Sequence, residues 1–420
     1  MSVRTAKLAN GLRIVTDRMD SVESVSLGVW VDAGTRNEPA EINGVSHLLE
    51  HMAFKGTARR SALDIASEIE DVGGQLNAYT SRETTVYYAT VLKENVGLGL
   101  DIVSDILLNS AFDEGELARE RAVVLQEIGQ ANDTPDDIIF DWFQEAAFPD
   151  QPLGRPVLGT SEIVGKMPRE ALVSYMAGQY GADRMVLAAA GNLDHDAFVA
   201  LAERAFSGVG AGAQRVSVPG SYSGGDWREV RDLEQAHLVL GFGGVGYADP
   251  DYYPLAVYST ALGGGMSSRL FQEVREKRGL VYSIYSFSSS YRDCGLFGLY
   301  AGTGEAELGE LVGVVTDELR RAASEPMEEA EVARARMQIK ASVLMSLEST
   351  SSRAERLARQ ILVYGRPLTI AEISEKIDSV TAEDVRRIAA RLLDSAPTLA
   401  ALGPVGKLDE YGTVSERLGA

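Results

Sequence analysis

An internal repeat is the feature that most limits what this chain of 420 residues can fold into. Three segments recur in the same order, each at an offset of 211 or 212 residues. The pairs are Leu153–Leu158 with Tyr364–Thr369, Leu187–Asn192 with Leu399–Pro404, and Ser26–Gly34 with His237–Val245. Agreement at nearly one offset indicates two copies of one folding unit. Since 420 residues also exceed what a single hydrophobic core usually supports, we expect at least two domains.

The order of local signals is the same in both copies. A β-branched strand is followed by two helices, a pair of strands, long helical segments near 94–148 and 307–363, and a closing strand. Because helices and strands are partly segregated, the pattern favours an α+β fold in which a mostly antiparallel sheet packs with helices. The Gly-, Ser- and Ala-rich stretch between the copies predicts a linker at 211–228, which separates a domain at 1–210 from one at 229–420.

Composition limits the class of function. The formal net charge of −21 argues against a nucleic-acid partner and indicates an acidic, solubilising surface. The alternative is that part of this charge lines a cavity that prefers basic peptides. No apolar run is long enough for a membrane span. The single cysteine, Cys294, and an N-terminus that resembles a first strand more than a signal peptide predict a cytoplasmic protein.

Two of the four histidines lie in one pentapeptide, His47-Leu48-Leu49-Glu50-His51, which has the H-x-x-E-H spacing. On a helix, residues i and i+4 lie on one face about 6 Å apart, so both imidazoles can bind one metal ion. Glu50 lies on nearly the same face, where it can take a proton from a metal-bound water. The aligned segment of the second copy, Leu255–Ser259, has no histidine, which predicts one metal site per chain.

A catalytic zinc usually has three protein ligands, so a third ligand is needed. Glu120 and Glu127 are seven residues apart and therefore share a face of a predicted helix. The residues between them, 122–125, are apolar and predict a buried helix, in which a carboxylate needs a partner such as a metal. The composition of this segment does not choose between the two glutamates.

Taken together, these segments resemble a known family. The stretch Gly44–Thr57, the strand Asn77-Ala78-Tyr79-Thr80 and the pair Glu120 and Glu127 are similar to the pitrilysin/insulinase family of inverted-motif zinc peptidases. That family includes bacterial two-domain members and the β subunit of mitochondrial processing peptidase, and the resemblance covers nearly the whole chain. It implies Glu127 as the third ligand of one Zn²⁺ per chain, and Glu120 as a carboxylate that orients a ligand.

The resemblance also implies roles in substrate binding. Arg275 and Tyr282 occupy the positions of a family arginine and tyrosine that contact the substrate near the scissile bond, where a cation and a phenol can stabilise an oxyanion. Without the resemblance, Arg275 would be interpreted as a helix C-terminal cap and Tyr282 as a core strand residue. The strand Asn77–Thr80 is expected to be an edge strand that pairs with an extended peptide by β-addition.

The function implied by the resemblance is that of a zinc metalloendopeptidase which hydrolyses extended oligopeptides or unfolded segments, with Glu50 assisting the attack of zinc-bound water. Relatives fold each copy as an α+β domain, and the two domains form half of a clamshell. Because this chain carries both the zinc motif and Arg275 with Tyr282, we expect a homodimer that closes a chamber. The alternatives are a non-catalytic structural subunit of the same fold and a peptide-binding protein that retains zinc.

Overall fold

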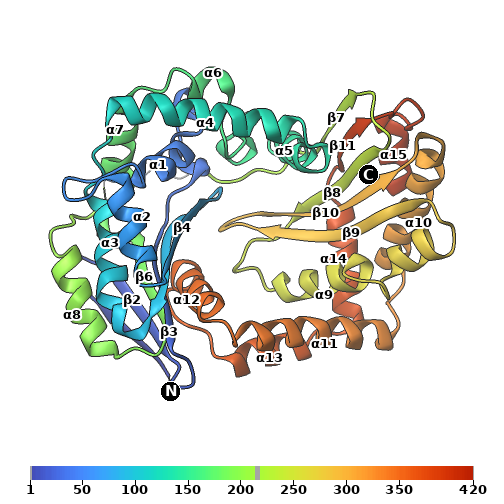
Figure 1. The fold of residues 1–420 in the computed structure, drawn as a ribbon. Coiled ribbons are helices and arrows are strands. Elements are labelled where there is room, and N and C mark those ends of the chain that lie inside the picture. Colours follow the sequence, from blue (N-terminus) through green and yellow to red (C-terminus); the bar gives the residue numbers. More distant parts are fainter. Residues whose placement is uncertain (1, 213–217, 420) are drawn as a thin grey trace. The chain divides into compact units, whose positions relative to one another are not determined.

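The computed structural model describes residues 2–212 and 218–419, and these residues form two compact units. The first unit comprises the described parts of 1–129, 155–217 and 345–368, and the second comprises those of 130–154, 218–344 and 369–420. Each unit contains one sheet with helices packed on it (Figure 1). The α+β class predicted from the sequence is confirmed.

The sheet of the first unit has six strands in the described part of the chain, in the order β1-β2-β6-β3-β5-β4. These are β1 (Val3–Lys7), β2 (Arg13–Arg18), β3 (Ser24–Val31), β4 (Gln75–Thr80), β5 (Thr85–Leu92) and β6 (Met185–Gly191). All neighbouring strands are antiparallel except β2 and β6. Among the described strands β4 pairs with β5 alone, so β4 forms one edge of the sheet.

The sheet of the second unit repeats this topology. Its described strands have the order β7-β11-β8-β10-β9, and β7 and β11 form its parallel pair. These are β7 (Gly225–Val230), β8 (Ala236–Gly244), β9 (Val281–Ser290), β10 (Gly295–Thr303) and β11 (Thr398–Gly403). The order matches that of the first sheet without β1, which confirms the two homologous, mostly antiparallel domains predicted from the repeat.

The helices follow the repeat as well. The first half of the sequence forms α1 (Val45–Ala53), α2 (Ala62–Glu70), α3 (Val96–Leu108), α4 (Glu114–Asn132), α5 (Pro135–Ala147), α6 (Ser161–Val164), α7 (Arg169–Gln179) and α8 (His195–Phe206). The second half forms α9 (Tyr252–Gly263), the π-helical turn η6 (Phe271–Glu276), α10 (Leu308–Ser324), α11 (Glu329–Ser346), α12 (Thr350–Tyr364), α13 (Ile370–Asp378), α14 (Ala382–Leu393) and α15 (Tyr411–Leu418). Within the described residues, no helix is both long and apolar enough to cross a membrane.

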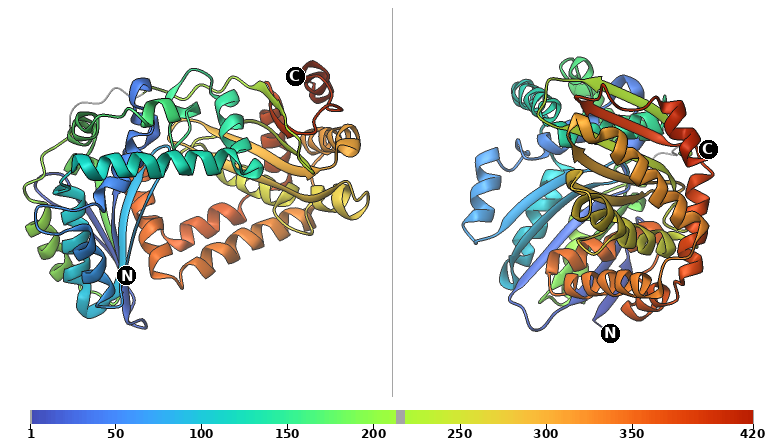
Figure 2. Two further views of the ribbon diagram at one scale, coloured as in Figure 1. Left: turned by 45° about the horizontal axis from the view of Figure 1, so that its top comes forward. Right: turned by 90° about the vertical axis from the view of Figure 1, so that its right-hand side faces the viewer.

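Each unit takes one helix from the other half of the sequence. Helix α12 packs on β2, β3 and β6 of the first sheet, and α5 packs on β7, β8 and β11 of the second (Figures 1 and 2). Leu357 and Ile361 of α12 thus join Trp30 in one buried cluster, and Phe143 of α5 joins Val239 in another. The units therefore depart from the continuous domains 1–210 and 229–420, because a helix from each half completes the core of the other unit.

The linker predicted at 211–228 also differs from the observed structure. Strand β7 begins at Gly225 and hydrogen-bonds in parallel register to β11, so the end of the expected linker belongs to the second sheet. The part at 213–217 lies outside the described residues.

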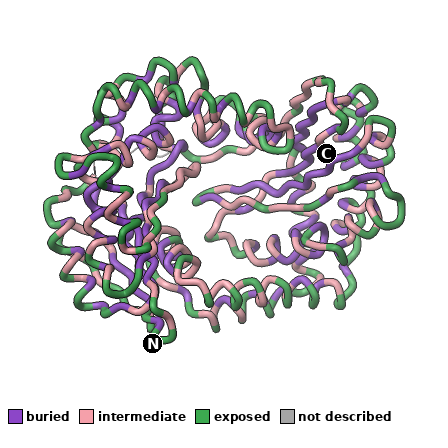
Figure 3. Tube along the Cα trace, in the orientation of Figure 1, coloured by how far each residue is buried: buried purple, intermediate pink, exposed green. Residues whose placement is uncertain are grey.

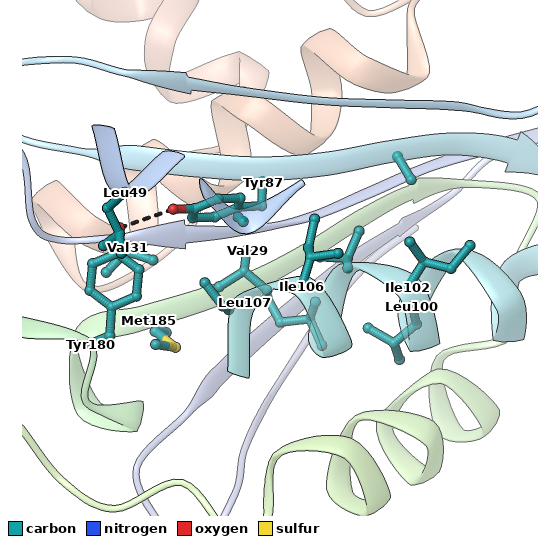
Figure 4. Close-up of a cluster of buried hydrophobic side chains, with 14 of the residues drawn as sticks. Val29, Val31, Leu49, Tyr87, Leu100, Ile102, Ile106, Leu107, Tyr180 and Met185 are labelled. Carbon is teal, nitrogen blue, oxygen red and sulfur yellow. Dashed lines mark hydrogen bonds between the residues drawn. The ribbon is translucent and has the colours of Figure 1, made fainter. Parts of the chain in front are cut away.

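The face of the first sheet opposite α12 carries the core that holds α1. Side chains of β3, of α3 and of Leu49 in α1 meet in this core (Figure 4). The hydroxyls of Tyr87 and Tyr180 lie 3.2 Å apart within it, so these two buried polar groups satisfy each other. Figure 3 shows that the inner strands of each sheet are largely buried, whereas the edge strands are more exposed and many helices alternate between buried and exposed faces. Helix α1 is therefore anchored by one apolar face, and its opposite face remains available for a site.

Candidate metal centre

Helix α1 presents two chemically different faces. Val45, Leu48, Leu49 and Met52 are buried in the core of the first unit. They recur at the i, i+3, i+4, i+7 spacing of an amphipathic helix, so packing of this face fixes the rotation of α1 about its axis. The three polar residues of the H-x-x-E-H motif lie on the other face and are only partly buried.

Glu38 fixes the start of α1. Its side chain is 3% exposed. Oε1 accepts a hydrogen bond from the backbone N–H of Ser46 at 2.8 Å, and Oε2 accepts from that of Gly44 at 2.8 Å. Oε2 also accepts from Asn43 Nδ2 at 2.8 Å. The carboxylate thus satisfies N–H groups that have no partner within the helix, next to the first histidine of the motif.

Gly44 is required where the chain turns into α1. Its φ is +94°, and a Cβ atom at this position would lie 2.8 Å from the carbonyl oxygen of Leu158. Any other residue would be strained and would have to displace neighbouring backbone. One residue into the helix, the Ser46 hydroxyl donates to Tyr175 Oη at 2.8 Å, and Tyr175 donates to the carbonyl of Gly34 at 3.0 Å.

Three candidate ligand atoms converge at the polar face of α1. Glu127 Oε2 of α4 lies 3.6 Å from His47 Nε2 and 3.5 Å from His51 Nε2. The two imidazole rings are 4.6 Å apart between centroids, and the ligand atoms of all three residues lie within 4.8 Å of one another. Four-coordinate zinc with bonds of about 2.1 Å separates its ligand atoms by roughly 3.4 Å. The donor set and its spacing therefore fit a zinc ion held by two imidazoles and a carboxylate.

Glu120 contacts the second histidine from the outside of this cluster. Its side chain is 7% exposed, and Oε2 lies 3.0 Å from His51 Nδ1. The other oxygen pairs with Lys55 Nζ at 2.7 Å. This contact orients the ring so that Nε2 faces Glu127, as expected for a carboxylate behind a metal-binding histidine. His47 Nδ1, in contrast, is buried and has no hydrogen-bond partner among the described residues.

Glu50 lies beside the cluster and is held by the edge strand. The Thr80 hydroxyl of β4 donates to Glu50 Oε2 at 2.6 Å. Burial raises the pKa of Glu50, and the hydrogen bond from Thr80 acts in the opposite direction. Burial, followed by the charge of His51, lowers the pKa of His47 to about 4, which keeps its imidazole in the neutral form that binds metals.

The prediction that α4 is buried between Glu120 and Glu127 is wrong. The apolar run between Glu120 and Glu127 predicted a buried helix, but Ala122 and Val123 are exposed. Only one face of α4 is buried, through Leu117, Glu120, Val124 and Ile128. Glu120 lies on that buried face and Glu127 at its margin, which separates the two glutamates that composition left equivalent.

The remaining predicted residues lie on β4 and in the second unit. Asn77, Ala78, Tyr79 and Thr80 form part of the edge strand β4. In the second unit, the guanidinium carbon of Arg275 lies 5.5 Å from the ring centroid of Tyr282. Tyr282 is 77% exposed, so the alternative that it packs in a core is wrong. This arrangement leaves the phenol ring accessible to a ligand.

Sequence reasoning missed Glu38, Lys55 and the contact between Thr80 and Glu50. Glu38 lies outside any periodic segment, and two of the three hydrogen bonds that its carboxylate accepts come from backbone groups, which carry no sequence signal. Lys55 lies two residues after the end of α1 and about one turn after His51, and this spacing is the only local indication of its pairing with Glu120. Thr80 was expected to bind substrate, and its hydrogen bond to a side chain on α1 depends on how β4 packs.

Comparisons with known proteins find matches in both halves of the chain. Residues 13–161, which contain the whole donor cluster, match the model of the insulinase family, peptidase family M16. Residues 166–339, which contain Arg275 and Tyr282, match the model of the peptidase M16 inactive domain. A chain of complex III2 from Candida albicans, solved with Inz-5 bound, has the same fold with a TM-score of 0.88 at 23% identity, over 99% of each chain.

Two bacterial relatives cover almost the whole sequence. An uncharacterized zinc protease of Streptomyces coelicolor is 40% identical over 96% of this chain and 90% of its own length. An uncharacterized zinc protease of Bacillus subtilis is 40% identical over 95% of this chain and 98% of its own length. The chain therefore belongs to the insulinase family, peptidase family M16.

Proposed function

We propose that this protein is a zinc-dependent endopeptidase that acts on extended oligopeptides or unfolded segments. The observation that carries the proposal is the convergence of His47, His51 and Glu127 beside the Glu50 carboxylate. These three residues would hold one Zn²⁺ per chain. Zinc, when bound, supplies Lewis-acid activation of water and of the scissile carbonyl.

Proton transfer is assigned to Glu50. Its Oε2 accepts the hydrogen bond from Thr80, which leaves Oε1 to take the proton of the attacking water. The same carboxyl group then passes the proton to the leaving amine. Glu120 keeps His51 oriented. The low pKa of His47 keeps its imidazole neutral, so His47 does not compete for this proton.

Substrate binding is assigned to β4 and to Arg275 with Tyr282. A peptide that pairs with the free edge of β4 along Asn77–Thr80 gains backbone hydrogen bonds with little demand on its sequence. The strand carries Thr80 next to Glu50, so a peptide on this edge runs past the proton acceptor. Arg275 and Tyr282 would stabilise the negative charge that develops on the carbonyl oxygen.

We extend the proposal to a cytoplasmic homodimer that closes a chamber, in which each chain supplies Arg275 and Tyr282 to the other. This follows from the presence of both groups of residues in a single chain. Mixing the inactive variants Glu50→Gln and Arg275→Ala tests it, because a mixed dimer would combine an intact Glu50 with an intact Arg275. Recovery of activity on mixing is expected. A mixture that stays inactive, or a monomer in sedimentation with full activity, would contradict the exchange.

The proposal as a whole is tested by zinc content and peptide hydrolysis, measured side by side for four proteins. Glu50→Gln should retain zinc and lose about 10²–10⁴-fold in kcat. Glu127→Gln should lose both zinc and activity. Glu114→Gln, an exposed change on the same helix as Glu127, is the matched control and should lose neither. A Glu50→Gln protein that hydrolyses peptides at the wild-type rate would disprove the mechanism and favour the alternative of a peptide-binding or structural subunit.

A further inference from the structure

A cavity of about 390 Å³ lies within the first unit, between the sheet and α12. It is on the face of the sheet opposite α1, because Trp30 belongs to the cluster under α12 whereas its neighbours Val29 and Val31 belong to the core that holds α1. Its volume is in the range of small-ligand sites. The lining comes from β3, β4, β5 and α12: Ser26, Trp30, Tyr79, Tyr88, Ser352, Glu355.

Aromatic rings and one fixed carboxylate define the chemistry of this cavity. Trp30 Nε1 and the Tyr79 hydroxyl both donate to Glu355 Oε2, each at 2.8 Å. Burial, followed by the charge of Glu355, raises the pKa of Tyr79, which therefore stays protonated and keeps donating. The ring of Tyr88 meets that of Tyr79 at 63°, with 6.4 Å between centroids. Glu355 is thus held in position by two donors that leave its second oxygen available.

The second oxygen of Glu355 has a weak partner. Arg359 Nη2 lies 3.4 Å from Oε1, and the Arg359 side chain is 60% exposed, so this i,i+4 pair contributes little and is easily displaced. The hydroxyls of Tyr88 and Ser352 have no hydrogen-bond partner among the described residues. Both line the cavity and can bind a ligand.

We propose that this cavity binds a guanidinium or ammonium group on an apolar stem, that is, the side chain of arginine or lysine. A carboxylate in a cavity lined by tryptophan and tyrosine side chains attracts such a group through a charge-assisted hydrogen bond, and the rings of the lining can add cation–π contact. The net charge of −21 acts in the same direction. An anion is disfavoured, because it would face the Glu355 carboxylate, although Arg359 and the start of α12 would attract it.

The peptide source of this side chain follows from the position of β4 and rests on the proposed function. Along β4, Leu76 and Ala78 pack toward the core of α1 and Thr80 contacts Glu50, whereas Tyr79 faces the cavity. A peptide added to this edge would place alternate side chains on the two faces of the sheet. One residue would face Glu50, and its neighbours would face Tyr79 and the cavity.

The first test is calorimetric binding of N-acetyl-arginine amide to the full-length protein, compared with the uncharged N-acetyl-citrulline amide. The arginine compound should bind at least tenfold more tightly than the citrulline compound, and Glu355→Gln should abolish this difference. Ser352→Lys, which places a competing cation one turn before Glu355, should also abolish it. Arg359→Gln should leave binding unchanged or tighten it. The control Glu203→Gln on α8 removes the same charge far along the chain from the cavity and should have no effect.

Unchanged binding in Glu355→Gln, or loss of binding in Arg359→Gln alone, would overturn the proposal. The second test measures kcat/KM for peptides that carry arginine or citrulline at successive positions. An arginine preference at alternate positions that disappears in Glu355→Gln is expected. If the amide binds as expected but peptide preference does not depend on Glu355, the cavity serves a free cation and the peptide source is wrong. Amide binding without any peptidase activity would overturn the proposed function and leave the cavity proposal standing.

Discussion

The helix that carries the metal motif and its counterpart in the second unit begin in different ways. At α1, the buried Glu38 carboxylate accepts hydrogen bonds from backbone N–H groups. At α9, the buried Asp251 pairs instead with Arg387 and Arg391 of α14, at 2.6 and 2.8 Å. The Arg155 guanidinium also lies near the start of α1, where it donates to the backbone carbonyl of Glu38. The two copies thus differ in the groups that donate to the buried carboxylate, which are backbone N–H groups and the Asn43 amide in the first copy and guanidinium groups in the second.

The motif face of the helix differs in the same sense. The segment of α9 aligned with the motif is Leu255–Ser259, and Leu255 and Tyr258 are each 1% exposed in the core of the second unit. The same positions in α1 carry His47 and Glu50, which stay partly exposed. The same backbone arrangement therefore occurs with this helix face buried in an apolar core in the second unit and with the face left for ligands in the first. A few side chains determine which of the two occurs.

The largest effect is expected when the first copy receives a residue of the second. His51→Ser introduces the residue found at Ser259 and removes one of the three proposed zinc ligands. We expect zinc content near zero and a loss of several kcal/mol in transition-state stabilisation, roughly 10³-fold in kcat/KM. Metal analysis and peptide hydrolysis measure this. His237→Asn, which removes an imidazole from the second sheet, should retain zinc and activity. Full zinc binding by His51→Ser would show that the donor cluster is not the metal site.

The two helix starts predict unequal costs in stability. Glu38→Ala leaves buried N–H groups of Gly44 and Ser46 without an acceptor, which costs about 2–4 kcal/mol in the free energy of unfolding. Asp251→Ala should cost about 1 kcal/mol, because its half-exposed arginine partners regain water and keep other carboxylates. Urea unfolding of both variants makes the comparison.

Glu41→Ala is the control for Glu38→Ala, because Glu41 is exposed in the same loop. It should change the free energy of unfolding by no more than about 0.5 kcal/mol. If the Asp251→Ala protein is less stable than the Glu38→Ala protein, the interpretation is wrong. The loss of an acceptor would then cost less for buried backbone N–H groups than for arginine side chains.

The sequence predicts what is local and repeated. The apolar spacing of α1 and the i,i+4 histidines determine which side chains share a face, so His47 and His51 could be predicted as metal ligands from the sequence. Glu127 was implied only by the family resemblance, because the composition of its helix did not separate it from Glu120. The sequence could not predict that α5 packs in the second unit and α12 in the first. An apolar stripe such as that of Leu357 and Ile361 shows that a helix packs on a core, but it does not show on which sheet. The role of Glu38 could not be predicted for a related reason, because the backbone N–H groups and the Asn43 amide that donate to it come together only when the loop folds.

A smaller loss is expected for Glu120→Gln. The amide can still accept from His51 Nδ1, but it loses the charge that makes the imidazole a better ligand and that pairs with Lys55. Such changes behind a metal ligand cost about 10–100-fold in metal affinity or activity. Competition with a chelator measures the zinc affinity. Lys55→Met removes only the outer partner of Glu120 and should reduce the zinc affinity less. An equal loss of zinc affinity in both variants would mean that the ion pair between Glu120 and Lys55, and not the contact between Glu120 and His51, supports zinc binding.

The smallest effect concerns the hydroxyl that each edge strand directs to the neighbouring helix. Thr80 of β4 donates to the Glu50 carboxylate, whereas Ser286 of β9 donates to the backbone carbonyl of Ser259 at 2.6 Å. Thr80→Val should lower kcat about fivefold, equivalent to about 1 kcal/mol from one lost hydrogen bond. Since this bond lowers the pKa of Glu50, its loss raises that pKa, and the acid limb of the kcat/KM profile should move to higher pH.

Ser286→Ala is the matched change in the second unit. Because its acceptor is a backbone carbonyl, the lost bond should reduce the free energy of unfolding by about 1 kcal/mol and leave the pH profile where it is. The two variants compare one kind of contact, a hydroxyl that joins the edge strand to the helix. In the second copy it should contribute to stability, and in the first copy it should also set the basicity of Glu50, the proposed proton acceptor. If both variants move the pH profile equally, or neither does, the hydroxyl of Thr80 has only the structural role that Ser286 has.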